Sequence, residues 1–105
     1  MVDKEELWRK SGLHQFQIVQ CVVTEHRGRF GIDVDVVTPT GRVPGFIDFV
    51  MLADSDEHPS PADFPAVGAV LEAVTLDFII PLGGELRLTA RKSSIERQRA
   101  QDKQR

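Results

Sequence analysis

The stretch FGIDVDVVTPTGRVPGFID, residues 30–48, decides the fold of this 105-residue chain. From position 30 to position 36 every second side chain is apolar. This period of two is typical of a strand with one buried face, so we expect the branched residues at 32, 34 and 36 in a core, and Asp33 and Asp35 in water. A turn at 38–41 leads to a short strand at 43–47, where Pro44 indicates a sheet edge or a bulge.

Working outward from this hairpin, we expect strands at 16–24, 67–78 and 85–91, which are rich in apolar and β-branched residues. Residues 53–66 hold three prolines and four acids, and we interpret them as an acidic surface loop rather than a metal site. A short helix at 3–10 places Trp8 over an open end of the core. Five short strands with one long loop predict an all-β, five-stranded Greek-key barrel of the OB type, whose closure removes exposed edges.

The charge divides the chain unevenly. Residues 1–90 hold 7 Lys/Arg and 14 Asp/Glu, whereas residues 91–105 hold 6 Lys/Arg and 2 Asp/Glu. An acidic body with a basic tail indicates a polyanion-binding arm, a tail that folds back on the body, or a solvated terminal helix. With Ser93 or Ser94 as N-cap and only Ile95 and Ala100 suited to burial, we expect a short, frayed helix with little reason to dock. The organisation is therefore an N-terminal cap at 1–13, a barrel at 14–92 and a basic tail at 93–105.

Several classes of function are disfavoured by the sequence. The single Cys21 lies within an apolar strand, where packing is the expected role, and the histidines belong to no recognisable catalytic motif. We find no phosphate-binding or dinucleotide-binding loop and no metal-ligand spacing, so we expect no enzyme activity, cofactor or metal. No apolar run is long enough to span a bilayer, and the acidic start is unlike a signal peptide. We therefore expect a cytoplasmic protein that does not contact membranes.

Residues from about 16 to 92 resemble the S1 domain, the RNA-binding OB-fold of ribosomal protein S1, polynucleotide phosphorylase and ribonuclease E. The resemblance rests on Phe-Gly-x-x-Val at 30–34, Gly-Phe-Ile-Asp at 45–48, Val-Gly at 67–68 and Leu-Thr at 88–89. It implies single-stranded RNA as the ligand, stacked on aromatic rings of the second strand.

The ligand face departs from the pattern of that family. Phe30 matches the first stacking aromatic, but Asp33 stands at the second, Asp48 replaces a histidine, and Glu85 falls near the usual basic position. A carboxylate cannot stack on a base and repels phosphate, so the usual face is predicted to bind RNA poorly.

Two functions follow as alternatives. The first is single-stranded RNA binding, in which the basic tail supplies the charge beside Phe30. Its candidate residues are Arg27, Arg29, Phe30, Arg91, Lys92, Arg97 and Arg99. The second is interaction with a basic protein partner, through an acidic face and an apolar anchor in the loop after the fourth strand. Its candidate residues are Asp33, Asp35, Asp48, Phe78, Ile80 and Leu82.

Overall fold

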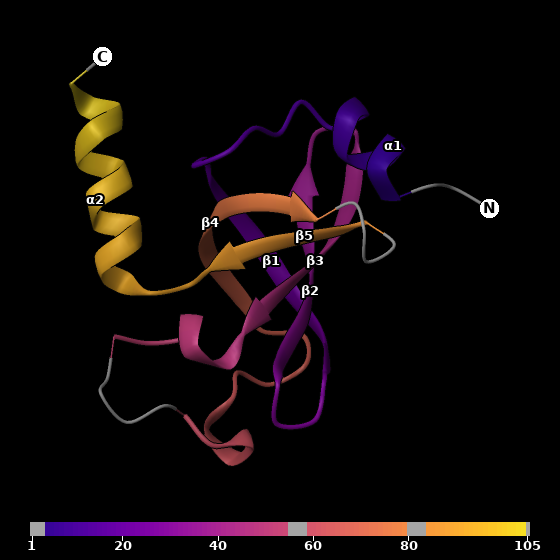
Figure 1. The fold of residues 1–105 in the computed structure, drawn as a ribbon, viewed down its shortest axis with the longest axis vertical. Helices are drawn as coiled ribbons and strands as arrows, with labels where there is room; N and C mark the ends of the chain where they lie inside the picture. The colour runs from indigo at the N-terminus through magenta and orange to yellow at the C-terminus, as the bar shows by residue number, and fades with distance from the viewer. Residues whose placement is uncertain (1–3, 55–58, 80–83, 105) are drawn as a thin grey trace.

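The computed structural model describes residues 4–54, 59–79 and 84–104. Within them, five strands close into one barrel in the order β1-β2-β3-β5-β4 (Figure 1). The strands are β1 (Ile18–His26), β2 (Gly31–Thr38), β3 (Gly41–Asp48), β4 (Val70–Ile79) and β5 (Glu85–Thr89). All neighbours run antiparallel except β3 and β5, which are parallel. This is the five-stranded OB-type barrel that the sequence predicted.

In the described part of the chain, two α-helices flank the barrel, and two short 3-10 helices lie in its long connection (Figure 1). They are α1 (Lys4–Lys10), η1 (Phe49–Met51), η2 (Pro61–Asp63) and α2 (Lys92–Lys103). Trp8 of α1 packs against the core and stacks on Phe78 with ring centroids 5.9 Å apart. Trp8 therefore packs on the core, and its role as the cover of an open end stays a prediction.

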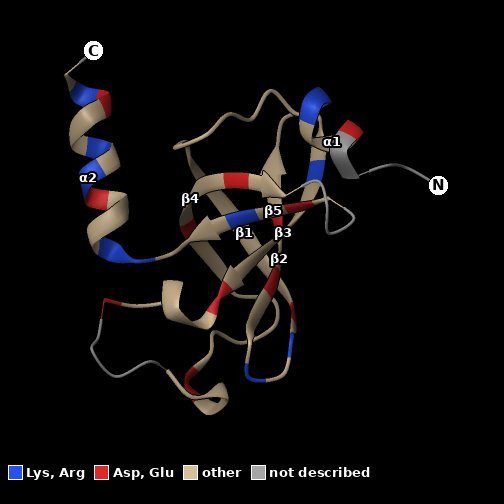
Figure 2. Ribbon diagram, in the orientation of Figure 1, with Lys and Arg blue, Asp and Glu red and all other residues tan. Residues whose placement is uncertain are grey.

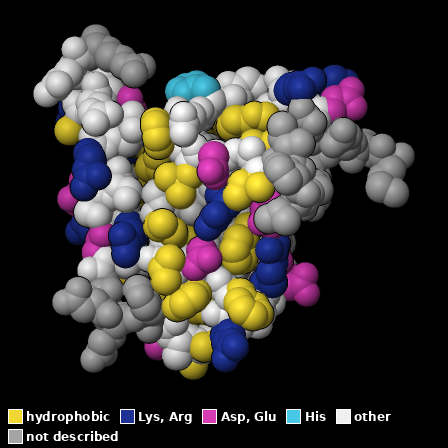
Figure 3. Space-filling model, viewed as in Figure 1, with side chains coloured by type: hydrophobic (Ala, Val, Ile, Leu, Met, Phe, Trp, Pro, Cys, Tyr) yellow, Lys and Arg dark blue, Asp and Glu magenta, His cyan; other side chains and the backbone are white. Residues whose placement is uncertain are grey.

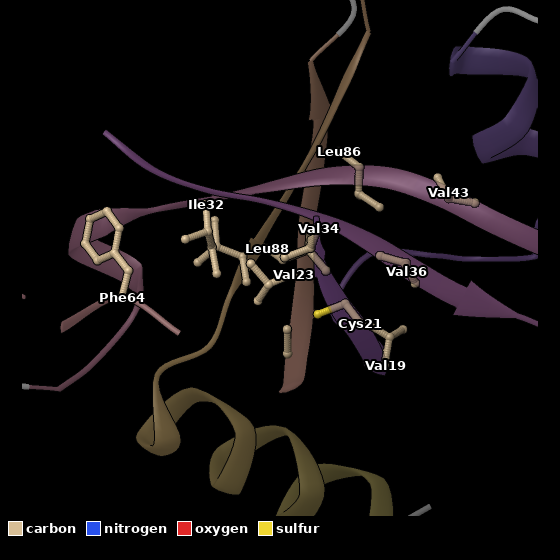
Figure 4. Close-up of a cluster of buried hydrophobic side chains, with 12 residues drawn as sticks. Val19, Cys21, Val23, Ile32, Val34, Val36, Val43, Phe64, Leu86 and Leu88 are labelled. Carbon is tan, nitrogen blue, oxygen red and sulfur yellow. The ribbon is translucent and has the colours of Figure 1, made fainter. Parts of the chain in front are cut away.

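The core consists mainly of branched apolar side chains, and all five strands contribute residues to it (Figure 4). Ile32, Val34 and Val36 are buried, as the alternation in residues 30–36 predicted. Cys21 and Val23 meet them from β1, and Phe64 closes the end near the long connection. Each fully buried side chain of this kind contributes about 1.5–3 kcal/mol, so this cluster provides most of the driving force for folding.

Two glycines permit the close approach of β2, β3 and β5. A Cβ atom at Gly31, whose φ is +146°, would lie 2.2 Å from the Ile47 carbonyl oxygen. A Cβ atom at Gly45 would lie 2.6 Å from Leu88 Cδ1. The glycines of the two sequence motifs are therefore required by packing, because any side chain would push the strands apart.

Two phenylalanines lie outside the strands to which the sequence pattern assigned them. Phe16 precedes β1 and adopts a left-handed backbone with φ of 62°. Phe30 belongs to the turn before β2, where its N–H donates to the Arg27 carbonyl at 3.0 Å. The exposed fractions of the two residues are 50% and 59%. At Phe30 a turn hydrogen bond holds the backbone, whereas at Phe16 the backbone is left-handed although its N–H donates to the Thr75 carbonyl of β4.

The C-terminal helix is present as predicted, but the expectation that it has little reason to dock was wrong. Residues 92–103 form a regular helix beside the barrel, and the residue buried on it is Gln98 rather than Ile95 or Ala100. Neither Ser93 nor Ser94 is the N-cap, which is Arg91. Sequence reasoning counted apolar residues only, and so it missed polar contacts that come from distant parts of the chain.

Candidate nucleic-acid interface

The outer surface of β2, β3 and β5 is the face on which the sequence placed its barrel candidates. Strand register puts Asp33 opposite Phe46, and Phe46 opposite Arg87. Asp33 and Arg87 lie between buried neighbours on their strands and so point to the outer face, which Phe46 shares through this register. Asp33 and Asp35 are partly buried rather than fully in water as predicted, with side-chain exposures of 26% and 30%.

Arg27 occupies the centre of this face and is held by two carboxylates. One of its terminal nitrogens lies 2.5 Å from Asp33 Oδ1 and 2.8 Å from Glu85 Oε1. Burial lowers the pKa of Arg27, but the hydrogen bonds to Asp33 and Glu85 outweigh this and raise that pKa above its ordinary value. Arg27, a sequence candidate for RNA binding, is therefore already neutralised by its own chain.

The same guanidinium covers an aromatic ring that the sequence interpretation missed. Arg27 Cζ lies 4.0 Å from the centroid of the Phe46 ring, and Phe46 is only 6% exposed. In the sequence analysis Phe46 is only a member of the Gly-Phe-Ile-Asp motif at 45–48 and is not a candidate for binding. The available signal was the alternation of β3, in which Gly45 and Ile47 point inward and Phe46 must point outward. A stacking surface thus exists on this face but is closed by Arg27.

The other arginines of the strands also lie near acids. Arg42 is 3.9 Å from Asp35 and Arg87 is 4.0 Å from Asp48. Exposed pairs at such distances contribute about 0–1 kcal/mol, but they reduce the charge available to a phosphate. Asp48 also has a structural role, because its side chain accepts a hydrogen bond from the Val50 N–H at 3.1 Å and caps η1.

Phe30 and Arg29 form an open pair in the β1–β2 turn. The guanidinium of Arg29 lies 5.6 Å from the centroid of the exposed Phe30 ring, and no ion pair of Arg29 is found among the described residues. Phe30 therefore presents an exposed aromatic surface, and Arg29 is a cation without a carboxylate partner among the described residues. The third RNA-binding candidate near this turn, Arg27, is paired.

Beside Arg27, a cavity of about 270 Å³ opens between β1, β2, β3 and β5. We call it the acidic groove, because Glu25, Asp33, Asp35 and Glu85 line it together with Arg27. It brings together two of the predicted partner-binding acids but not Asp48. Phe78 packs under Trp8 and is not a free anchor, whereas Ile80 and Leu82 lie outside the described residues.

The helix α2 carries the tail candidates and is attached to the barrel at two points. Asp54 accepts hydrogen bonds from the Ser93 N–H at 2.9 Å and from the Ser93 hydroxyl, so a distant carboxylate caps the helix. These hydrogen bonds lower the pKa of Asp54. Further along the helix, Arg99 forms an ion pair with Glu72 of β4.

The tail cations differ in their availability. Arg99 is paired, and Lys92 lies 4.0 Å from Glu96 on the same helix. Arg91 is the N-cap residue, and its buried Nε has no hydrogen-bond partner within the described part of the chain. Within that part, neither Arg97 nor Lys103 forms an ion pair. The charge map in Figure 2 shows the cations along α2 and the acids distributed over the strands.

Other chemistry has little support in this structure. Burial raises the pKa of the Cys21 thiol to about 12, so the thiolate that a nucleophile requires is scarce at neutral pH. Among the described residues, no group of three or more His, Cys, Asp or Glu is arranged to hold a metal ion. No described helix is both long and apolar enough to cross a membrane.

The closed strand order β1-β2-β3-β5-β4 defines an OB-fold, and comparison with known proteins agrees at the level of the fold. A chain in the crystal structure described as an a/eIF2alpha-aDim2p-rRNA complex from Pyrococcus horikoshii OT3 superposes with a TM-score of 0.65 and 14% sequence identity. The alignment covers 87% of this chain and 52% of the other, so this chain spans about half of that neighbour. No family model and no curated protein matches the sequence.

Proposed function

We propose that this chain is a non-catalytic RNA-binding module of the S1 type, and that it binds single-stranded RNA mainly through the cations of residues 91–103. The neighbour of the same fold was crystallised in a complex that contains rRNA, which supports the proposal by analogy of fold. The pattern of motifs in residues 30–48 supports the S1 type independently.

The observation that carries the proposal is the difference in pairing between the barrel and α2. Arg27, Arg42 and Arg87 each have a carboxylate within 4.0 Å. Arg97 and Lys103 of α2 have none among the described residues. Affinity for a single strand depends on cations that exchange counterions for phosphates, and only unpaired cations do so without first breaking an ion pair. We therefore assign the phosphate contacts to α2, with Arg29 as an additional contact.

Fluorescence anisotropy of a labelled single-stranded RNA across a salt series tests this function. We expect the logarithm of affinity to fall with the logarithm of salt at a slope of about −0.7 per phosphate contacted. The double variant Arg97→Glu, Lys103→Glu should lose most of the binding and flatten this slope. The double variant Lys10→Glu, Arg42→Glu is the control with the same change of net charge, because Lys10 already pairs with Glu6 at 2.8 Å and Arg42 with Asp35 at 3.9 Å. If the wild-type chain shows no binding at low salt, the proposed function is wrong.

The acidic groove supports a second candidate, the docking of a basic protein segment. Four carboxylates line this cavity and a single arginine lies among them, so a lysine or arginine side chain would find complementary charge there. A labelled Lys- and Arg-rich peptide should bind the wild-type chain and lose affinity in Asp35→Lys, with Asp63→Lys as the control. Equal binding by both variants would remove the acidic groove as the docking site.

A further inference from the structure

A second cavity of about 270 Å³ lies between α2 and the barrel, away from the acidic groove. We call it the helix groove. Val74 and Leu76 of β4 form its apolar floor, and the Phe16 side chain stands at its edge. Figure 3 shows hydrophobic side chains gathered on the barrel surface beside α2, with Lys and Arg side chains along the helix. The volume is near the lower end of small-molecule sites, about 300–1,000 Å³, which suits a single ring system.

The Phe16 side chain is held at this edge by a buried threonine. The Phe16 N–H donates to the Thr75 carbonyl at 2.8 Å, and the Gln17 N–H donates to Thr75 Oγ1 at 2.9 Å. The hydroxyl of Thr75 in turn donates to the His14 carbonyl at 2.6 Å. These bonds maintain a left-handed backbone that is unusual for a bulky residue, and from this backbone the half-exposed Phe16 side chain extends. The ring therefore offers an apolar surface for stacking at this groove.

The helix presents polar groups to this groove. Ser94, Arg97, Gln98 and Gln101 line it from α2, at the spacing of one helix face. A helix that docks by hydrophobic packing would turn an apolar stripe to the barrel. Here amides, a hydroxyl and a guanidinium face an apolar floor instead. Such a combination of flat apolar surface and convergent polar groups is typical of a ligand site rather than of a packed interface.

The charge of the helix groove identifies the class of ligand. No acidic residue is among the described residues that line it, and Arg97 is its one charged lining group. An anion therefore meets attraction there, whereas the acidic groove repels it. An aromatic ring beside a free guanidinium matches a base linked to a phosphate, since bases stack on aromatic side chains and phosphates pair with arginine.

We propose that the helix groove receives one nucleotide of the bound RNA, with its base against Phe16 and its phosphate at Arg97. This inference rests on the proposed RNA-binding function and locates the stacking contact away from Phe30, where the sequence placed it. The Gln98 amide nitrogen donates to Asp102 Oδ1 at 3.0 Å, so the groups that would contact the edge of the base are the Gln101 amide and the Gln98 side-chain oxygen. The inference makes α2 part of the ligand site rather than only a source of charge.

Matched ring deletions test the inference on the full chain. The affinity for a labelled oligouridine is measured at low salt for the wild type, Phe16→Leu and Phe30→Leu. Both substitutions remove one half-exposed ring and keep apolar bulk. We expect Phe16→Leu to weaken binding about tenfold or more, which is the usual consequence of losing one base stack. Phe30→Leu should change the affinity less than twofold.

The outcomes separate this inference from the function on which it rests. If the wild-type chain binds and Phe16→Leu binds within twofold of it, the helix groove is not the base site, while the RNA-binding function stands. If the wild-type chain does not bind, both proposals fail. A loss in both variants supports the helix groove and adds Phe30 as a second contact.

A second measurement requires no variant. In nitrogen-15 spectra of the wild-type chain titrated with uridine monophosphate and then with oligouridine, the side-chain amide signals of Gln98 and Gln101 should shift. Shifts confined to the backbone signals of residues 27–35, with both glutamine side chains unchanged, would overturn the inference.

Discussion

The acidic groove and the helix groove each have a volume of about 270 Å³. Each also has one arginine and one phenylalanine in or next to it. In the first, Arg27 is bound to Asp33 and Glu85 and lies over Phe46, so neither the cation nor the ring is available. In the second, Arg97 and Phe16 lie in the same cavity with no acid among the described lining residues. The two grooves show that residue types alone do not make a site, because their partners decide whether they are free.

The largest expected effect comes from disturbing the packing of β2 against β3, two strands that line the acidic groove. Gly31→Ala would place a methyl group 2.2 Å from the Ile47 carbonyl oxygen on a backbone that disfavours side chains. We expect a loss of about 3 kcal/mol in the free energy of unfolding, measured by urea denaturation. Gly28→Ala is the control, because its φ is +53° but no atom lies within 4 Å of the added group. It should cost about 1 kcal/mol. Equal losses would mean that the close approach of β2 to β3 is not a tight constraint.

The next effect concerns the threonine that holds Phe16 at the helix groove. Thr75→Val leaves the His14 carbonyl and the Gln17 N–H without a buried partner, at a cost of about 1–3 kcal/mol in the free energy of unfolding. Hydrogen exchange at Phe16 and Gln17 should accelerate at the same time. Thr38→Val, which removes an exposed bond to the Gly41 carbonyl, should cost much less. Unchanged exchange at Phe16 would show that this edge of the groove is positioned by other contacts.

A third prediction concerns a variant in which the arginine of the acidic groove, like that of the helix groove, has no carboxylate partner. The double variant Asp33→Asn, Glu85→Gln removes both carboxylates that hold Arg27 and releases its charge. RNA affinity should rise about three- to tenfold, with a steeper dependence on salt. The control Glu6→Gln, Asp63→Asn removes two acids elsewhere. If the control raises affinity equally, the gain comes from net charge and not from Arg27.

The smallest expected effect is a dependence of helix attachment on pH. Because hydrogen bonds with Ser93 lower the pKa of Asp54 from its ordinary value of 3.8, its carboxylate supports the helix cap at all pH values above that ordinary pKa. The support is lost as pH falls through the lower pKa of the folded state. The Ser93 amide signal should therefore shift in acid in the wild type, and should lack this step in Asp54→Asn. A step that persists in the variant would assign it to another group.

Alternation in residues 30–36 and the distribution of apolar residues were sufficient to predict the OB-type barrel, its core and the position of Trp8. These features depend on period and composition over a few neighbouring residues, which a sequence displays directly. The charge difference between body and tail was equally visible. The candidate residues of both functions could be nominated in the same way, although not ranked.

Tertiary structure alone decided which of these candidates are free. Arg27 meets Glu85, which lies 58 positions away, and Ser93 meets Asp54, which lies 39 positions away. Phe46 is covered by a residue from another element, and the Phe16 backbone is bound to Thr75 of β4. No local pattern encodes such contacts, because they arise only when barrel closure brings distant segments together. The sequence by itself therefore determined the scaffold and its net charges, and the fold determined which charges and rings remain available to a ligand.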